Sequence, residues 1–255
     1  MPSADISPQQ STYVQNSYYG ETSFANMRND TSGYSVDTTP DNTYYTIGIL
    51  RGNILGTSVY SHKSIMMDFD LSALPSGATI TAVTLKVKGA TMQNLGGGYV
   101  SYTAQDCDAI ILKGNFDSSI DTNDIDAFTG FTSGWGASDV TEYSSNWGPA
   151  AGGWSTSDFN SISLNSDGVS DANNAFVAGA RLKFYIGDYA HWYGNDDSFH
   201  NADLKQTRMN GHFDLGNSDS PFITVTYTEA VSGPVQEFKI SSGTLSVKSG
   251  TLTIK

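Results

Sequence analysis

The sequence predicts an all-β protein, with a jelly-roll β-sandwich over residues 1–228 followed by a small C-terminal three-stranded β-meander. Three observations lead to this fold class. Apolar and polar residues alternate in several short segments, which is the period of a strand with one buried face. Loops rich in Gly and Asp separate these segments, and no stretch of ten or more residues carries the apolar stripe of an amphipathic helix. Long connections join these segments instead of uniform tight hairpins, which favours a two-sheet jelly roll.

Two segments on either side of the turn "LPSGA" have the clearest strand pattern. In "KSIMMDFDLS", one face carries Ile65, Met67, Phe69 and Leu71, and the other carries Ser64, Asp68 and Asp70. In "TAVTLKVKG", the apolar set Val83, Leu85 and Val87 alternates with Thr84, Lys86 and Lys88. We therefore expect two strands, each with an apolar face toward the core and a polar face toward solvent.

Further strands are expected along the rest of the sandwich. The segments "DAIILKG", "FNSISLN", "RLKFYIG" and "FITVTYT" place apolar residues at alternate positions. The longest loop runs from about residue 115 to residue 158, and a short helical turn is expected around "SDANNAFVAG". The strand pattern stops near residue 228. Gly233 and Pro234 interrupt it and mark residues 229–235 as a linker.

The last residues of the chain repeat a heptad, because "SGTLSVK" is followed directly by "SGTLTIK". If Ser242-Gly243 and Ser249-Gly250 form two-residue hairpin turns, residues 236–255 fold into three antiparallel strands. All their apolar side chains then lie on one face. This apolar face of the meander consists of Phe238, Ile240, Leu245, Val247, Leu252 and Ile254.

The apolar face of the meander needs a cover, because so small a sheet is not stable with one apolar face in water. Each fully buried aliphatic side chain contributes roughly 1.5–3 kcal/mol, so six represent on the order of 10 kcal/mol before entropy is subtracted. The face either folds back on the sandwich or packs against neighbouring copies of the chain or another protein. We favour the second interpretation, and we expect a homo-oligomer in which neighbouring copies cover this face.

Composition restricts the partners. The net charge is −13, from 26 acidic and 13 basic residues, so nucleic acid is not an expected partner. Cys107 is the single cysteine, which excludes an intrachain disulfide framework. No membrane helix and no Sec signal are visible, so we expect no membrane contact. The protein is then either an exported protein that has lost its signal or a virion protein assembled in the host cytoplasm.

One stretch resembles the central signature of DNRLRE-type jelly-roll domains, a family related to carbohydrate-binding modules. It is "SIMMDFDLSALPSGATITAVTLKVKG", in which "FDLS" and "LPSGATI" match the family pattern. The closing "SPFITVTYT" and the opening "NSYYGETSFANMRND" are also similar, so the match spans about residues 11–228. The matching signature residues are Phe69, Asp70, Leu71, Ser72, Leu74, Pro75, Ser76, Gly77, Ala78, Thr79 and Ile80.

The resemblance implies a jelly roll on an extracellular or virion surface. The segments "GFTSGW" and "WSTSDFNSISLN" resemble loops of relatives in phage virion proteins and bacterial surface proteins, and terminal "GTLTIK" repeats are similar to those on phage particle proteins. We therefore expect a non-enzymatic virion surface protein, a capsid decoration or fibre-like subunit. Its expected partners are copies of itself and the major capsid protein or another virion protein.

The alternative is a glycan-binding module of a secreted or cell-surface protein. Every tryptophan falls in the loop-rich second half of the chain, and aromatic rings stack on the apolar C–H faces of sugars. The candidate glycan-stacking residues are Trp135, Trp147, Trp154, Trp192 and Tyr193. Aromatic side chains in loops also serve as core caps or as anchors between subunits.

A calcium site is the one candidate for a cofactor. The segment "DTNDIDAF" contains the hard oxygen ligands Asp121, Asn123, Asp124 and Asp126. Ile125 stands where an EF-type loop needs a ligand, so an ordinary Asx-rich loop is the alternative. The segment "HWYGNDDSFHNAD" holds a second polar cluster, with His191, Asp196, Asp197, His200 and Asp203. Its histidines bind a transition metal only if the fold brings them together.

Enzyme motifs are absent from the sequence. It contains no G-x-S-x-G elbow, no H-E-x-x-H zinc helix and no P-loop. Asp68 and Asp70 lie on one strand face, but acids two residues apart on a strand are more typical of a solvated face or a turn anchor than of a glycosidase pair. We expect no enzymatic activity.

Overall fold

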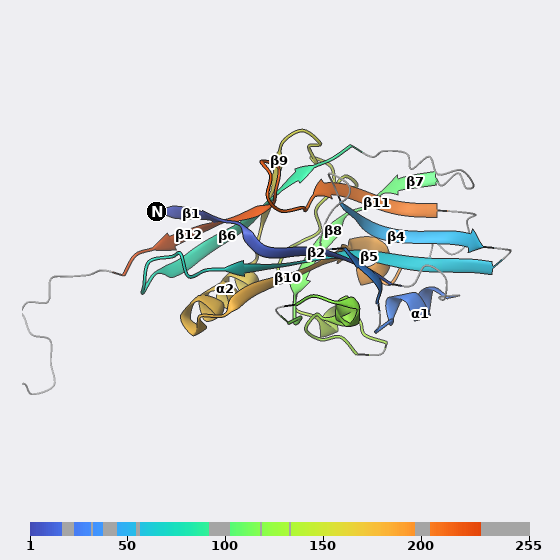
Figure 1. The fold of residues 1–255 in the computed structure, drawn as a ribbon, viewed down its shortest axis with the longest axis horizontal. Helices are drawn as coiled ribbons and strands as arrows, with labels where there is room; N and C mark the ends of the chain where they lie inside the picture. Colours follow the sequence, from blue (N-terminus) through green and yellow to red (C-terminus); the bar gives the residue numbers. More distant parts are fainter. Residues whose placement is uncertain are drawn as a thin grey trace, which may run out of the picture.

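The computed structural model of the chain describes residues 1–16, 23–31, 33–37, 45–54, 57–91, 103–117, 119–132, 134–196 and 205–230. Within these ranges the protein is mostly β, as predicted. Hydrogen bonds join twelve strands into one sheet, in which β7 and β11 are parallel and the other paired strands are antiparallel (Figure 1). The strands are β1 (Ser3–Ile6), β2 (Pro8–Asn16), β3 (Gly33–Asp37), β4 (Tyr45–Ile54), β5 (Thr57–Asp70), β6 (Thr79–Gly89), β7 (Thr103–Asp106), β8 (Ala109–Lys113), β9 (Phe159–Ser163), β10 (Arg181–Asp188), β11 (Lys205–His212) and β12 (Phe222–Thr228).

The helices are short. They are α1 (Phe24–Arg28), α2 (Ser166–Ala178), the 3₁₀ helices η1 (Thr122–Asp126) and η2 (Ala137–Asp139), and the π-helical turn η3 (Tyr189–Tyr193). The predicted helical turn is part of α2, which begins earlier because the Asn165 side chain accepts two first-turn backbone N–H groups at 3.0 Å. Asn173 docks α2 on β6 by bonding both backbone groups of Ile80 at 2.9 Å. None of the helices in the described ranges is long and apolar enough to cross a membrane.

Strand β5 is the point at which the sheet forks. Its residues up to Lys63 pair with β4, and its residues from Ile65 onward pair with β10. Strand β2 pairs along the opposite edge, because Lys63 faces both Gly48 of β4 and Gln15 of β2. One branch of the sheet continues through β4, β11, β6, β12 and β1, and the other continues through β10 and β8. Both edges of β5 are therefore occupied between Lys63 and Phe69.

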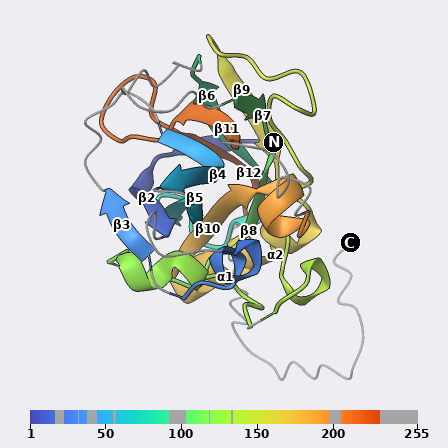
Figure 2. The ribbon, with the colours of Figure 1, turned by 90° about the vertical axis from the view of Figure 1, so that its right-hand side faces the viewer.

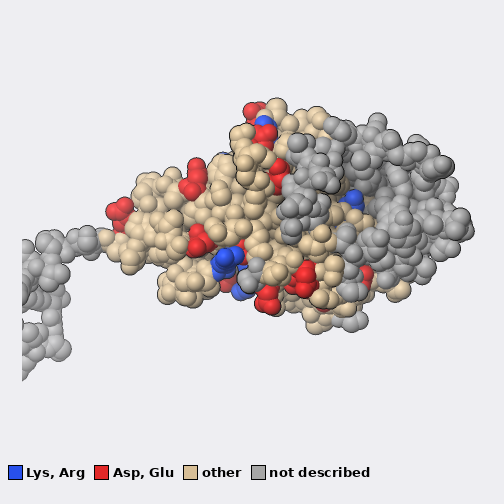
Figure 3. All heavy atoms as spheres, viewed as in Figure 1, with Lys and Arg blue, Asp and Glu red and all other residues tan. Residues whose placement is uncertain are grey.

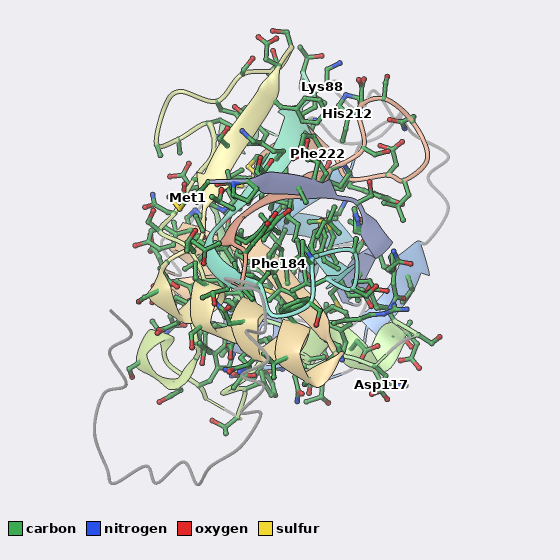
Figure 4. All side chains as sticks on the ribbon, turned by 90° about the vertical axis from the view of Figure 1, so that its left-hand side faces the viewer. Met1, Lys88, Asp117, Phe184, His212 and Phe222 are labelled. Atoms are coloured by element: carbon green, nitrogen blue, oxygen red, sulfur yellow. The ribbon has the colours of Figure 1, made fainter. Side chains whose placement is uncertain are left out.

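Two buried clusters of apolar side chains lie on the two faces of β5. The larger cluster contains Ile65 and Phe69 of β5 together with inward side chains of β6, β10 and β12. Phe184 of β10 lies within it, among the strands (Figure 4). The smaller cluster contains Met66, from the other face of β5, and apolar side chains of the loop at residues 116–135. Because side chains alternate along a strand, both faces of β5 are buried.

The prediction that the polar face of β5 is solvated is wrong for Ser64 and Asp68, which are fully buried. The Asp68 carboxylate accepts a hydrogen bond from Gln10 at 2.9 Å and forms an ion pair with Arg181 at 2.7 Å. Neighbouring strands β2 and β10 supply these partners, and sequence periodicity does not show them. Asp70 is a turn anchor, one of its two predicted roles, because its side chain accepts the backbone N–H of Ser72 at 2.9 Å.

The N-terminus and the end of β12 lie at the same end of the body, opposite α1 (Figure 1). Strand β1 pairs with β12, and the backbone N–H of Tyr227 donates to the carbonyl of Pro2 at 3.1 Å. Residues 231–235 of the predicted linker and the whole predicted meander, 236–255, lie outside the described residues.

We predict that Arg181→Met lowers the free energy of unfolding by about 1–3 kcal/mol, because it leaves the buried Asp68 carboxylate without its cation. Urea denaturation at pH 7 measures the change. Adding Asp68→Asn to this variant is expected to restore part of the loss, since the buried charge is then removed. Equal stability of Arg181→Met and the wild type would show that the ion pair does not contribute.

Candidate functional site

The five aromatic residues predicted to stack on glycans fall into two separate groups. Trp135, Trp192 and Tyr193 belong to the smaller buried cluster, and each is at most 5% exposed. Trp147 and Trp154 lie elsewhere, with their ring centroids 5.6 Å apart and their planes tilted by 32°. The two groups occupy different environments and are considered separately.

Core packing accounts for the first group. The Trp192 ring stacks on His62, with centroids 4.5 Å apart, and on Tyr185, at 5.3 Å. Trp135 lies 5.0 Å from Trp192 and contacts Phe128 edge to face. Their ring faces are covered by other side chains, so they act as core caps in this structure, which is the alternative role given for loop aromatics. The sequence placed these rings in loops, but it did not show that the loops fold over β5.

Arg28, at the end of α1, fastens this aromatic group. The side chain is 4% exposed, and its guanidinium lies 3.8 Å from the centroid of the Trp135 ring. Its nitrogens donate to the backbone carbonyls of Trp192 and Trp135 at 2.7 Å and of Tyr193 at 3.3 Å. Burial lowers the pKa of Arg28 from its usual value. One cation therefore joins α1 to the loop at Trp135 and to η3, which are far apart in the sequence.

His62 of β5 is fully buried beneath the Trp192 ring. Desolvation lowers its pKa to about 3, because burial disfavours the charged imidazolium. The imidazole is therefore neutral at physiological pH. The flat imidazole ring packs against the Trp192 ring. No sequence pattern pointed to this role of His62.

The predicted calcium ligands form a helix cap. The Asp121 side chain accepts the backbone N–H of Asn123 at 2.7 Å, and the Asp124 side chain accepts the backbone N–H of Asp121 at 2.8 Å. This capping box starts η1, and it places Ile125 in the core. Desolvation is the main cause that raises the pKa values of Asp124 and Asp126. The contacts of Asp121 and Asp124 are those of a helix cap, and the calcium site stays a prediction.

The histidine cluster is described only in part. His191 lies near Asp196, whose backbone carbonyl is 3.0 Å from the imidazole Nδ1. Asp197, His200 and Asp203 lie outside the described residues. In the part of the chain that the structure describes, no three His, Cys, Asp or Glu side chains are grouped so that they could hold a metal ion.

The second aromatic pair lines a surface hollow of about 210 Å³. The loop at residues 146–154 forms one wall, and residues 160–162 of β9 form the other. Trp147 is 9% exposed, and Trp154 is partly exposed. The lining contains no charged side chain; its residues are Asn146, Trp147, Gly148, Ala151, Gly152, Gly153, Trp154, Asn160, Ser161 and Ile162.

A buried carboxylate holds the loop wall of the hollow in place. Asp108 accepts the side-chain amide of Asn146 at 2.9 Å and the backbone N–H of Ala151 at 2.7 Å. Gly148 sits against the same residue, since a Cβ there would lie 3.0 Å from the Asp108 Cα. Gly152 and Gly153 both have positive φ, at 83° and 79°, which favours glycine at these positions.

The other wall is fastened by Asn160. Its side chain accepts the backbone N–H of Ser155 at 2.7 Å and donates to the Ser155 and Val87 carbonyls at 2.8 and 3.2 Å. The indole of Trp154 lies on Gly89 of β6, where a Cβ would be 2.7 Å from the indole nitrogen. The spacing "WGPAAGGW" between the two tryptophans was the only sequence signal for the hollow. Nothing in the sequence pointed to Asp108, Asn160 or Gly89.

In a comparison with known proteins, no protein-family model and no curated protein matches the chain. The resemblance to DNRLRE-type domains therefore stays a prediction. The apolar face of the meander, from Phe238 to Ile254, lies outside the described residues, so its role also stays a prediction.

We predict that Arg28→Met lowers the free energy of unfolding by about 2–4 kcal/mol, because three carbonyls lose a donor and the ring contact with Trp135 is weakened. Arg28→Lys is expected to recover only part of this, since an ammonium group does not reproduce the planar fork of donors. Thermal and urea denaturation measure both variants. If the Arg28→Lys variant were as stable as the wild type, the hydrogen bonds of the guanidinium would not be what stabilises this part of the fold.

We also predict that His62 makes the protein less stable in acid. The folded-state pKa of about 3 lies below the ordinary value of 6.5, so the unfolded chain binds one more proton between these pH values. The contribution of this group to stability is complete above about pH 6.5. It falls by roughly 1 kcal/mol per pH unit as the pH drops toward 3.

Urea denaturation between pH 7 and pH 4 tests this dependence. His62→Phe keeps a flat ring against Trp192 and removes the titrating group, so the slope of stability against pH should become shallower in the variant. Equal slopes in the two proteins would mean that His62 already gains its proton in the folded state at mildly acidic pH.

Proposed function

We propose that the protein is a non-enzymatic structural subunit of a phage virion surface, either a capsid decoration or a fibre-like subunit. Its body is a jelly-roll sandwich, and its C-terminal β-meander attaches it to neighbouring copies or to another virion protein. The observation that carries the proposal is the pair of repeated heptads at residues 242–255, which follows the predicted linker 229–235 and a strand, β12, that is already paired on both edges.

The packing of the body supports the sandwich. The larger buried cluster collects side chains of β6 and β12 together with side chains of β5, β8 and β10. Seen along the long axis, β6, β9 and β11 lie on one side, and β8 and β10 with both α-helices lie on the other (Figure 2). An apolar core between two such sets of antiparallel strands is typical of jelly rolls.

The end of the body supports a separate attachment module. Strand β12 pairs with β1 on one edge and with β6 on the other, so no further strand can add to β12. The predicted meander therefore does not continue the sheet at β12, and its six apolar side chains need a cover of their own. A neighbouring subunit supplies such a cover by symmetry, since identical apolar faces can pack against each other.

The surface and the sequence resemblance support a location on a particle. Acidic side chains outnumber basic ones over the face shown in Figure 3, in line with the net charge of −13. Such a surface keeps a protein soluble and discourages nonspecific contact with nucleic acid. The terminal repeats resemble those of phage particle proteins, and this resemblance is the reason why we propose a virion as the location.

We predict that two charges on the apolar face of the meander abolish assembly. The variant Leu245→Glu with Leu252→Glu should be a folded monomer, because a buried apolar contact then has to desolvate two carboxylates. The matched control, Ser246→Glu with Thr253→Glu, places the same charges on the opposite face. It should assemble like the wild type. Light scattering on the full chain gives the mass of each protein, and circular dichroism checks the fold.

A wild-type monomer would remove the homo-oligomer from the proposal and leave attachment to a different virion protein. Binding to purified virions that lack the protein then provides the test. If neither self-assembly nor particle binding occurs, or if the control variant fails as completely as the apolar-face variant, the attachment function is refuted.

A further inference from the structure

Strand β9 lies at the margin of the body and has an open edge (Figure 2). Among the described residues it pairs with β6 alone, and the backbone N–H of Leu164, directly after β9, donates to the carbonyl of Val83 at 2.9 Å. Every second residue of an antiparallel strand bonds the same partner, so Asn160 and Ile162 also bond β6. The residues whose backbone groups point away from β6 are therefore the exposed Phe159, Ser161 and Ser163.

The edge of β9 lacks the features that usually protect an open strand edge. Charged residues and prolines block the addition of a further strand, and β9 contains neither. Strands β1 and β8, at the two ends of the main path of the sheet, are better protected. Strand β1 is only four residues long and carries Asp5, and the second edge of β8 is bridged by Glu142 and Trp147. Strand β9 is therefore suited to accept another strand.

The hollow beside Trp154 lies along this open edge, because residues of β9 line it and residues of β6 do not. Trp147 and Ile162, which belong to the larger buried cluster, are part of its lining. The side chains of Asn146 and Asn160 in the lining are already hydrogen-bonded within the protein. A cavity of about 150 Å³ can hold a benzene ring, so about 210 Å³ is enough for an aliphatic side chain. The hollow thus offers apolar surface beside unpaired backbone groups.

We propose that the last heptad strand of a neighbouring copy, residues 251–255, adds to the open edge of β9 and directs its apolar side chains into the hollow. This inference rests on the proposed attachment function and names the surface to which the meander attaches. When a strand adds to a sheet edge, backbone hydrogen bonds give affinity, and pockets for alternate side chains give specificity. The heptad strand has the required pattern, because Leu252 and Ile254 alternate with polar residues.

The pairing within the meander determines the direction of the added strand. With the predicted turn at residues 249–250, the two threonines of the last strand bond the preceding strand, so the backbone groups of Leu252 and Ile254 point to the outer edge. In a parallel pair, a bonding residue lies level with a residue of the partner strand that bonds elsewhere. When the two five-residue strands are aligned end to end, Leu252 lies level with Asn160. Ile254 lies level with Ile162, so both apolar side chains face the hollow.

Charge favours the same contact. Residues 238–255 contain three lysines and no acidic residue. Residues 1–237 contain all 26 acidic residues and the other 10 basic ones. Opposite net charges accelerate the approach of two surfaces, so the basic heptads are attracted to the acidic body of a neighbouring copy.

Light scattering of full-length Ser161→Pro across a dilution series is the first experiment. The Ser161 N–H points away from β6, so proline removes a donor from the open edge and leaves the pairing with β6 in place. The dissociation constant of the assembly should rise at least about tenfold, because a backbone hydrogen bond is lost and the proline ring occupies the edge. The matched control, Ser161→Thr, keeps the N–H and should assemble like the wild type. Circular dichroism checks the fold of both variants.

A disulfide between copies gives a second test that does not depend on the proline variant. In the parallel alignment, Thr253 lies level with Ser161 on the outer face, at a separation that a disulfide can span. A mixture of full-length Ser161→Cys and Thr253→Cys proteins should therefore form this cross-link under mild oxidation, and mass spectrometry of the linked peptides identifies it. The matched control is Ser3→Cys, at an exposed position of β1, which should not link to Thr253→Cys.

The proposal is overturned if the wild-type chain is a monomer, if a folded Ser161→Pro protein assembles as tightly as the wild type, or if Thr253→Cys links equally well to both cysteine partners. Failure of this inference can be distinguished from failure of the attachment function. Assembly that survives Ser161→Pro but is lost with the charges at positions 245 and 252 would retain attachment through the heptads and exclude only the edge of β9.

Discussion

The arrangement of the body depends on strand β5, whose two edges are both paired between Lys63 and Phe69 and whose two faces are both buried there. Its partners β4 and β10 share one edge and β2 takes the other, so the sheet forks where the pairing changes. Inward side chains of β6, β10 and β12 cover one face, and loop aromatics held by Arg28 cover the other. Both faces of β5 are thus used for packing within the protein, so a ligand or partner has to bind at other surfaces.

The proposed attachment function does not use the residues packed around β5. Attachment is assigned to the C-terminal heptads, which follow a strand already paired on both edges. The hollow at the edge of β9, where Asp108 and Asn160 hold a glycine-rich loop beside Trp154, is a further feature outside the packing around β5.

Local sequence patterns predicted much of the fold and little of the candidate site. Alternation around Phe69, Leu85 and Phe184 located central strands, because period-two burial is a local property of a chain. Burial of Asp68 was not predictable, since its partners come from β2 and β10, far away in the sequence. The four tryptophans looked equivalent in the sequence. Only the folding of the loop at residues 116–135 over β5 separates the buried Trp135 from the partly exposed Trp154.

Hydrogen exchange across a dilution series of the full chain tests the central claim most directly, namely that a closed body carries a separate module for attachment. Amide hydrogens of residues 236–255 should become more protected as the protein concentration rises, while those of β5 stay equally protected throughout. High protection of residues 236–255 that does not change with concentration would contradict the account, because it would mean that the heptads fold back on their own body.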